Sequence, residues 1–153
     1  MEIVRTLFEE NLNELLITTF RLILDYEEQS LRSISDVPVT ISEAHMIEAI
    51  YKHPDGTNVS AIAPQLGIAV PTATVAIKKL EGKGFVTKLP CAEDGRRLIV
   101  RLTPKGTRIA RAHQIFHHHM VRNISGHFSE DEKDVLLSML QKLNIFFAKR
   151  VES

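Results

Sequence analysis

Residues 58–102 read NVSAIAPQLGIAVPTATVAIKKLEGKGFVTKLPCAEDGRRLIVRL, and this stretch decides the fold. Its first half contains two short helical segments, 58–66 and 70–82, which are divided by Gly67. A short helix, a tight turn that contains glycine and a second helix are typical of a helix-turn-helix. The sequence Gly82-Lys83-Gly84 then stops the second helix. We therefore expect residues 70–82 to be the second helix of this motif.

The second half of the stretch changes from a helical pattern to a strand pattern. Residues 85–89 and 98–102 are rich in apolar and β-branched side chains, which favour strands. The polar and turn-forming residues 90–97 separate them. The pattern predicts a β-hairpin with a basic tip, and a hairpin directly after a helix-turn-helix is a wing.

Helical patterns precede the motif. Residues 3–32 carry apolar side chains at helical spacing, with no Gly or Pro among them. Pro38 interrupts the chain. A second helix begins at Thr40, because Glu43 three residues later completes a capping box.

Two more helices follow the wing. Thr103 and Pro104 are a favoured helix start, with Thr as the N-cap and Pro in the first turn, and this helix is expected to reach about Ser125. The last helix begins after Ser129, which forms a capping box with Glu132.

The predicted fold is mainly α with a small β-wing (α+β). It is a single domain, 1–153, in which a winged helix-turn-helix lobe, 40–103, is flanked by the N- and C-terminal segments 1–35 and 104–150. These terminal helices carry more apolar surface than a small core needs. We therefore expect them to be dimerisation helices of a homodimer.

The composition excludes several classes of protein. No apolar run approaches the roughly 18 residues that cross a bilayer, so no membrane partner is expected. Acidic residues near the N-terminus argue against a secretory signal. Cys91 is the only cysteine, which fits a reducing compartment. We expect a cytoplasmic protein.

The charge is unevenly distributed along the chain. The formal net charge is zero, but residues 57–111 hold ten basic and three acidic residues, a net charge of +7, and the remainder carries −7. Neutralising phosphates requires a local basic surface, not a basic protein. The segment is therefore a candidate nucleic-acid surface, and a merely solvated charged face is the alternative.

Three motifs give the chain a resemblance to a known family. Residues 80–86 (LEGKGFV), 94–96 (DGR) and 102–106 (LTPKG) resemble, in order and spacing, three motifs of the MarR family of bacterial regulators. The resemblance spans about residues 8–148. It implies a dimeric repressor that binds pseudo-palindromic operators in double-stranded DNA, with one recognition helix in each major groove.

The resemblance also implies roles for individual residues. The recognition helix would contact DNA through its exposed start and outward face, and the wing Asp would orient a neighbouring Arg in the minor groove, with the next Arg as an alternative. The implied DNA-binding residues are Pro71, Thr72, Thr74, Lys78, Lys79, Asp94, Arg96 and Arg97. The chain departs from many relatives at Val75, where an Arg is common, at Pro64 and at Ala69, which replaces a Ser/Thr cap.

Residues 27–32, 42–45 and 113–121 resemble the family branch that represses fatty-acid synthesis. That branch responds to acyl chains on acyl carrier protein. It implies an apolar effector cavity lined by residues such as Phe20, Leu24, Ile47 and Phe116. Plain core positions are the alternative for each of these side chains.

The histidines suggest a rival effector. His113 and His117 are one helical turn apart, a spacing that suits metal chelation. His45 and Glu27 would complete four ligands, in an arrangement similar to that of the zinc-sensing MarR branch. No cofactor is required for DNA binding, and zinc stays a candidate. A redox role for Cys91 is a weaker possibility, because no second cysteine is present to pair with it.

Two other classes of function fit the sequence less well. An enzyme is not expected, because the sequence has no nucleophile elbow, phosphate loop or H-E-x-x-H motif. A winged helix that binds only proteins is the remaining alternative, and the basic wing argues against it.

Overall fold

The computed structural model describes residues 5–151. About 70% of the chain is helical, and two strands form one small antiparallel sheet. The elements in order are α1 (Leu7–Ile34), α2 (Ile41–Tyr51), α3 (Val59–Gln65), α4 (Val70–Gly82), β1 (Val86–Pro90), β2 (Leu98–Leu102), α5 (Pro104–Ser125) and α6 (Glu130–Val151). The predicted α+β class with a winged helix-turn-helix is confirmed.

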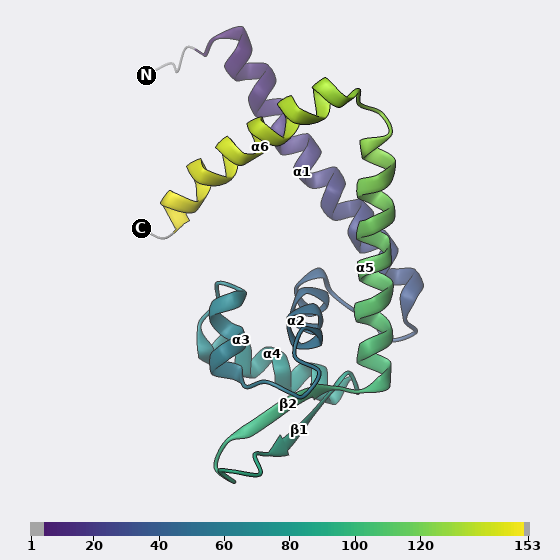
Figure 1. Cartoon of the computed structure of the whole chain (residues 1–153), viewed down its shortest axis with the longest axis vertical. Helices are drawn as coiled ribbons and strands as arrows, with labels where there is room; N and C mark the ends of the chain where they lie inside the picture. The colour runs from purple at the N-terminus through teal and green to yellow at the C-terminus, as the bar shows by residue number, and fades with distance from the viewer. Residues whose placement is uncertain (1–4, 152–153) are drawn as a thin grey trace. The chain divides into compact units, whose positions relative to one another are not determined.

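The chain divides into two compact units. One unit ends at Gln114 and the other begins at Ile115, within α5. The first unit contains the helix-turn-helix, with α2, α3 and α4 gathered above the hairpin of β1 and β2 (Figure 1). The second contains the rest of α5 and α6.

Capping boxes fix the starts of three helices. The box of Thr40 with Glu43 at α2 and that of Ser129 with Glu132 at α6 form as predicted. A third box, at Thr6, starts α1 at Leu7. Residues 5 and 6, which the expected helix 3–32 includes, are not helical, and residues 3 and 4 lie outside the described part of the chain.

A single apolar core holds the helix-turn-helix together. Its side chains come from α2, α3, α4, both strands and the start of α5. Ile47, Ile62, Ile77 and Leu80 are fully buried in it. Ile77 and Leu80 lie three residues apart, so they share the buried face of α4.

The first strand begins one residue later than expected. The amide of Phe85 donates a hydrogen bond to the carbonyl of Leu80, which closes the end of α4. Gly84 permits this turn, because its φ of +79° lies in the left-handed region. Phe85 is consequently part of the helix stop, and its ring is fully buried in the core.

The wing is a two-stranded hairpin with a third strand-like contact. Val86 pairs with Leu102 at its base and Pro90 with Leu98 at its end. Thr57, which precedes α3, also exchanges two backbone hydrogen bonds with Val100. This contact joins the hairpin to the helix-turn-helix and was not visible in the sequence, because a single bridging residue leaves no periodic pattern.

Gly106 explains the motif at the start of α5. A Cβ atom at this position would collide with the carbonyl oxygen of Phe85. The hydroxyl of Thr103 caps the helix by accepting a hydrogen bond from the amide of Gly106, and it donates one to the carbonyl of Gly84. The close approach joins α5 to the turn that ends the recognition helix.

The terminal helices leave large apolar side chains exposed. In α1, Leu15, Ile17 and Phe20 are each more than 60% exposed. None of the residues of α6, all of which are described, is buried. Among the described residues, no single helix is long and apolar enough to cross a membrane, and only α3 and α4 taken together, bent by 108°, meet the length and composition requirements.

Candidate nucleic-acid interface

Helix α4 presents one face to the core and the other to solvent. Ala73, Ile77 and Leu80 are buried at helical spacing. The opposite face carries the five α4 residues predicted to bind DNA, all of them exposed: Pro71, Thr72, Thr74, Lys78 and Lys79. The structure thus places all five on one accessible helix surface.

The two threonines of this surface differ in their hydrogen bonding. The hydroxyl of Thr74 donates to the carbonyl of Val70 at 2.9 Å, within its own helix. In the described chain no hydrogen bond of the Thr72 hydroxyl is found. Thr72 therefore keeps its donor for an external partner, whereas Thr74 offers chiefly its methyl group.

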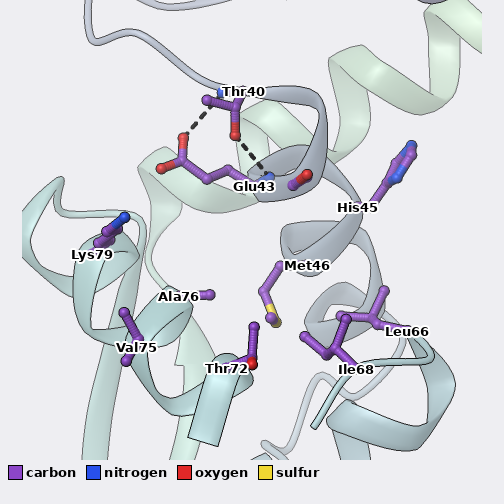
Figure 2. A pocket seen from close by; sticks show the side chains of 11 residues that line it. Thr40, Glu43, His45, Met46, Leu66, Ile68, Thr72, Val75, Ala76 and Lys79 are labelled. Carbon is purple, nitrogen blue, oxygen red and sulfur yellow. Dashed lines mark hydrogen bonds between the residues drawn. The ribbon is translucent and has the colours of Figure 1, made fainter.

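A cavity of about 600 Å³ borders the recognition helix (Figure 2). It is lined by the start of α2, the turn between α3 and α4, and Thr72, Val75 and Lys79 of α4. Met46 and Ile68 contribute apolar side chains to its lining, and Thr40 and Ser42 contribute polar ones. The outward face of α4 thus borders a hollow whose lining includes one lysine, Lys79.

The wing tip is held by a short hydrogen-bonded turn. The amide of Arg97 donates to the carbonyl of Asp94, and the amide of Cys91 donates to the carbonyl of Arg97. The Asp94 carboxylate accepts a hydrogen bond from the backbone amide of Arg96 at 3.1 Å, and its other oxygen lies 4.0 Å from Nε of Arg97. The arginine side chain near Asp94 is therefore that of Arg97, the alternative partner, and both arginines are exposed.

Some of the basic residues of the segment 57–111 have partners within the chain. Lys83 is bound by Glu43, with 2.8 Å between Nζ and each carboxylate oxygen. Lys88 lies 3.6 Å from Glu81, and Arg101 donates to the carbonyl of Asp55. The basic surface open to a ligand is consequently narrower than the net charge of +7 indicates, and its exposed members include Lys78 and Lys79 on α4 and Arg96 and Arg97 at the wing tip.

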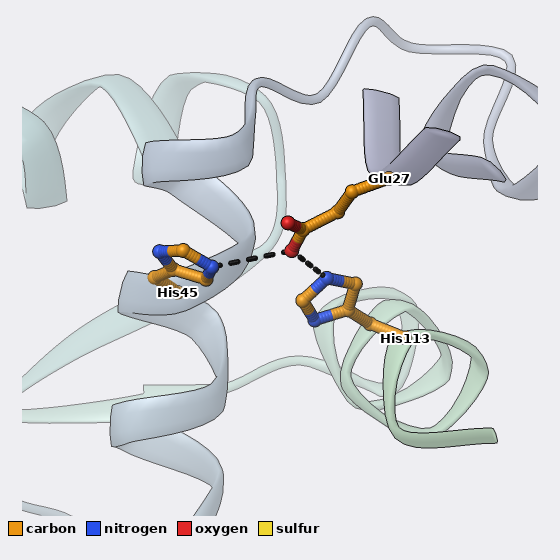
Figure 3. A group of neighbouring side chains, drawn as sticks. All are labelled: Glu27, His45 and His113. Atoms are coloured by element: carbon orange, nitrogen blue, oxygen red, sulfur yellow. Dashed lines mark hydrogen bonds and ion pairs between the residues drawn. The ribbon is translucent and has the colours of Figure 1, made fainter. Parts of the chain in front are cut away.

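A second cluster lies where α1, α2 and α5 meet (Figure 3). Glu27 and His113 are buried, and Oε1 of Glu27 is 2.6 Å from Nε2 of His113 and 3.2 Å from Nε2 of His45. These ligand atoms all lie within 4.8 Å of one another. The structure therefore brings together three of the four predicted metal ligands. The fourth, His117, belongs to the other compact unit.

Glu48 is a member of this cluster that sequence reasoning missed. Its Oε1 atom lies 2.9 Å from Nδ1 of His113. The signal was its position three residues after His45 on α2, which puts both side chains on one helix face. Burial alone lowers the pKa of His113, but the carboxylates of Glu48 and Glu27 outweigh burial and raise this pKa above its ordinary value.

The four predicted effector-pocket residues have different environments. Phe20 is exposed and Leu24 half-buried on α1, whereas Ile47 is fully buried in the core of the helix-turn-helix. Phe116 belongs to the second unit. An acyl-chain cavity between these residues stays a prediction.

Two comparisons with known proteins point to the same family. The MarR family model matches residues 39–98, from the start of α2 to the start of β2. FabT from Streptococcus pneumoniae, solved in complex with DNA, is 32% identical and has a TM-score of 0.84, over 92% of this chain and 97% of FabT. The chain belongs to the MarR family. The prediction of a transcription regulator, and not an enzyme, is thereby confirmed.

Other relatives are more distant. The HTH-type transcriptional regulator PchR from Bacillus subtilis (strain 168) is 22% identical over 121 residues, which are 77% of this chain and 71% of PchR. The MarR family transcription regulator SP03579 has a TM-score of 0.78 at 18% identity, over 94% of this chain and 93% of the other. At this identity the second likeness shows the fold alone.

Proposed function

We propose that this MarR-family chain is a cytoplasmic, dimeric repressor that binds a pseudo-palindromic operator in double-stranded DNA. The observation that carries the proposal is the open face of α4 beside a basic wing tip in the same compact unit. In this role α4 lies in the major groove, with Thr72 and Thr74 at base edges and Lys78 and Lys79 at phosphates. Arg96 or Arg97 enters the adjacent minor groove, oriented through Asp94.

The test is binding to an operator selected by the protein itself from a random duplex pool. Fluorescence anisotropy compares this duplex with a scrambled duplex of the same length over a range of salt concentrations. We expect the logarithm of the association constant to fall linearly with that of salt concentration, because phosphate contacts release counterions. We also expect a clear preference for the selected duplex. Binding to neither duplex would instead support a winged helix that binds only proteins.

The exposed apolar side chains of α1 and α6 support dimerisation through residues 1–35 and 104–150. Mass measurement by light scattering after gel filtration tests this proposal. The wild type is expected at twice its 17.3 kDa chain mass. Charges introduced at exposed apolar positions, such as Leu15→Glu on α1, are expected to give monomers, because an unpaired charge would be buried in the interface. A monomeric wild type would contradict the assignment.

We propose acyl chains on acyl carrier protein as the effector, which makes fatty-acid synthesis genes the target. The resemblance of residues 27–32, 42–45 and 113–121 to the fatty-acid-synthesis branch of the family supports this choice, and the similarity to the DNA-bound FabT fits it. Long-chain acyl carrier protein is titrated into the protein–operator complex, with the unacylated carrier as the control. A shift in operator affinity with the acylated form alone is expected. Equal effects of the acylated and the unacylated carrier would show that the acyl chain is not the effector.

A zinc-responsive regulator is the second candidate, favoured by the cluster of Glu27, His45 and His113. Imidazole nitrogen and carboxylate oxygen are zinc ligands, and these three side chains converge from three helices. Bound zinc would act by linking these helices, with a solvent molecule as a further ligand, and the fourth ligand expected from the sequence, His117, stays a prediction.

Zinc binding is measured by calorimetry on the wild type and on His45→Ala, which removes a half-exposed ligand and so leaves the core packed. The control is His118→Ala, because His118 is exposed and lies outside the cluster. We expect the wild type to bind one zinc ion per chain. The affinity for zinc should fall by about tenfold or more in His45→Ala and stay unchanged in His118→Ala. Equal binding by all three proteins would place any zinc elsewhere.

A further inference from the structure

The recognition helix ends in a partly buried ionic contact with α2. Lys83 is the C-cap residue of α4, and its Nζ atom lies 2.8 Å from both carboxylate oxygens of Glu43. The same Nζ atom lies 2.8 Å from the carbonyl oxygen of Pro38. An ammonium group has three N–H donors, and three oxygens surround it here. The side chains of Lys83 and Glu43 are only 29% and 11% exposed.

Glu43 is fixed in place independently of Lys83. Its carboxylate accepts a hydrogen bond from the backbone amide of Thr40 at 3.0 Å, and its own amide donates to the Thr40 hydroxyl (Figure 2). The carboxylate lies in the first turn of α2, and the ammonium lies at the end of α4. Each charge therefore has the sign that its helix terminus favours. Lys83 thus meets a carboxylate that is already oriented.

This contact restrains the C-terminal end of α4, whereas the turn of the helix-turn-helix restrains its start. At the start of α4, the turn is closed by the amide of Ile68, which donates to the carbonyl of Ala63 in α3. At the far end, Lys83 ties the helix to α2 and to the segment before it, across about 40 residues of sequence. The direction of α4, and with it the aim of Thr72 and Lys79, is therefore set at both ends.

We propose that Lys83 and Glu43 are positioning residues, which orient the recognition helix for sequence discrimination and make no contact with DNA themselves. The proposal rests on the DNA-binding function proposed above. It assigns to Lys83 a role opposite to the one its place in the basic segment suggests, because its donors are directed at Glu43 and Pro38. Two rival roles remain for comparison, a phosphate contact and a purely stabilising ion pair.

The test uses Glu43→Gln, Lys83→Met and the double variant. Gln keeps the acceptor that caps α2 and removes only the charge, so Glu43→Gln preserves the fold. Met keeps the apolar stem of Lys83. Lys79→Met is the matched control, because Lys79 is an exposed lysine on the same helix and the proposed phosphate contact. Operator and scrambled-duplex affinities are measured over a salt series, with thermal unfolding in parallel.

We expect each single variant to lower the ratio of operator to scrambled-duplex affinity by about tenfold, as the loss of a charge-assisted hydrogen bond predicts. The double variant should be no worse than either single variant, because the two residues act as one unit. The salt dependence should stay that of the wild type, whereas Lys79→Met should reduce its slope by about one.

Two results would overturn the proposal. A reduced salt slope in Lys83→Met with a normal slope in Glu43→Gln would make Lys83 a phosphate contact. An unchanged affinity ratio with a lowered unfolding temperature would make the pair only a stabilising one. Failure of the wild type to prefer any duplex is a separate outcome, because it rejects the proposed DNA-binding function before the variants are compared.

Discussion

Nε2 of His113 lies 2.6 Å from Oε1 of Glu27, and both side chains are buried although 86 residues separate them in sequence. The pair joins α1 to α5. Removing one partner of such a pair leaves the other charge buried without a compensating charge. Glu27→Gln should therefore lower the free energy of unfolding by roughly 2–4 kcal/mol. Denaturant unfolding with a chelator present measures this loss. Glu28→Gln, which breaks only the exposed pair with Arg32, should cost less than about 0.5 kcal/mol.

The raised pKa of His113 predicts how stability depends on pH. Glu27 from α1 and Glu48 and His45 from α2 face or adjoin this ring. Because the folded state holds its proton more tightly than the unfolded state, the stabilisation is complete below the ordinary histidine pKa. It is lost as pH rises through the raised pKa of His113.

With metal removed, the difference in unfolding free energy between the wild type and His113→Gln should shrink as pH rises. Urea unfolding at a series of pH values from about 6 to about 9 tests this trend. The exposed His118→Gln variant should show no such trend. A difference that grows with pH would mean that burial, and not the two carboxylates, dominates the pKa of His113.

Thr72 and Thr74 should differ on DNA. Valine keeps the shape and the methyl group of threonine but removes the hydroxyl. Because Thr74 already donates to Val70, Thr74→Val should retain operator selectivity, whereas Thr72→Val should lose roughly 1–3 kcal/mol of discrimination. Affinities for the operator and for single-base variants of it provide the measurement. Equal losses of discrimination in both variants would show that the bond to Val70 does not keep the Thr74 hydroxyl from reading a base, and no loss in either variant would show that neither hydroxyl reads one.

The wing arginines should contribute to affinity without contributing to folding. Both side chains are exposed, so Arg96→Ala should leave thermal unfolding unchanged and weaken operator binding by about 1–3 kcal/mol. Arg97→Ala is the matched comparison, because its side chain is the one near Asp94. A larger loss for Arg97→Ala would identify it as the minor-groove residue. Unchanged affinity in both variants would remove the wing from the interface.

Gly106 and Gly82 should respond oppositely to alanine. At Gly106 a Cβ atom meets the carbonyl of Phe85, so Gly106→Ala should destabilise the protein by about 1–3 kcal/mol. At Gly82 no atom lies within 4 Å of the added Cβ, so Gly82→Ala should be neutral or slightly stabilising. Chemical denaturation of both variants measures the contrast. Equal stability of the two would contradict the close packing of α5 on the turn after α4.

Local patterns in the sequence predicted most element boundaries. Residues 70–82 and 98–102 form α4 and β2 with the expected limits, and Thr40 and Ser129 cap the helices that follow them. Phe85 was expected in a strand, but it belongs to the turn that closes α4, where its amide donates a hydrogen bond to the carbonyl of Leu80. Strand propensity carries no information about such a hydrogen bond, so the sequence did not predict it. Helical periodicity predicted which side chains of α4 are exposed, whereas their assignment to DNA came from the resemblance to the MarR family.

The sequence by itself determined the order of the helices and the wing, the buried face of α4 and the concentration of basic residues around it. Periodicity, helix caps and glycine stops act over a few residues, so they can be recognised in the sequence without knowledge of the tertiary structure. Only the tertiary structure decided which charges stay available. Lys83 pairs with Glu43, and Glu48 lies against His113. These contacts join residues far apart in sequence, so they depend on how the helices pack.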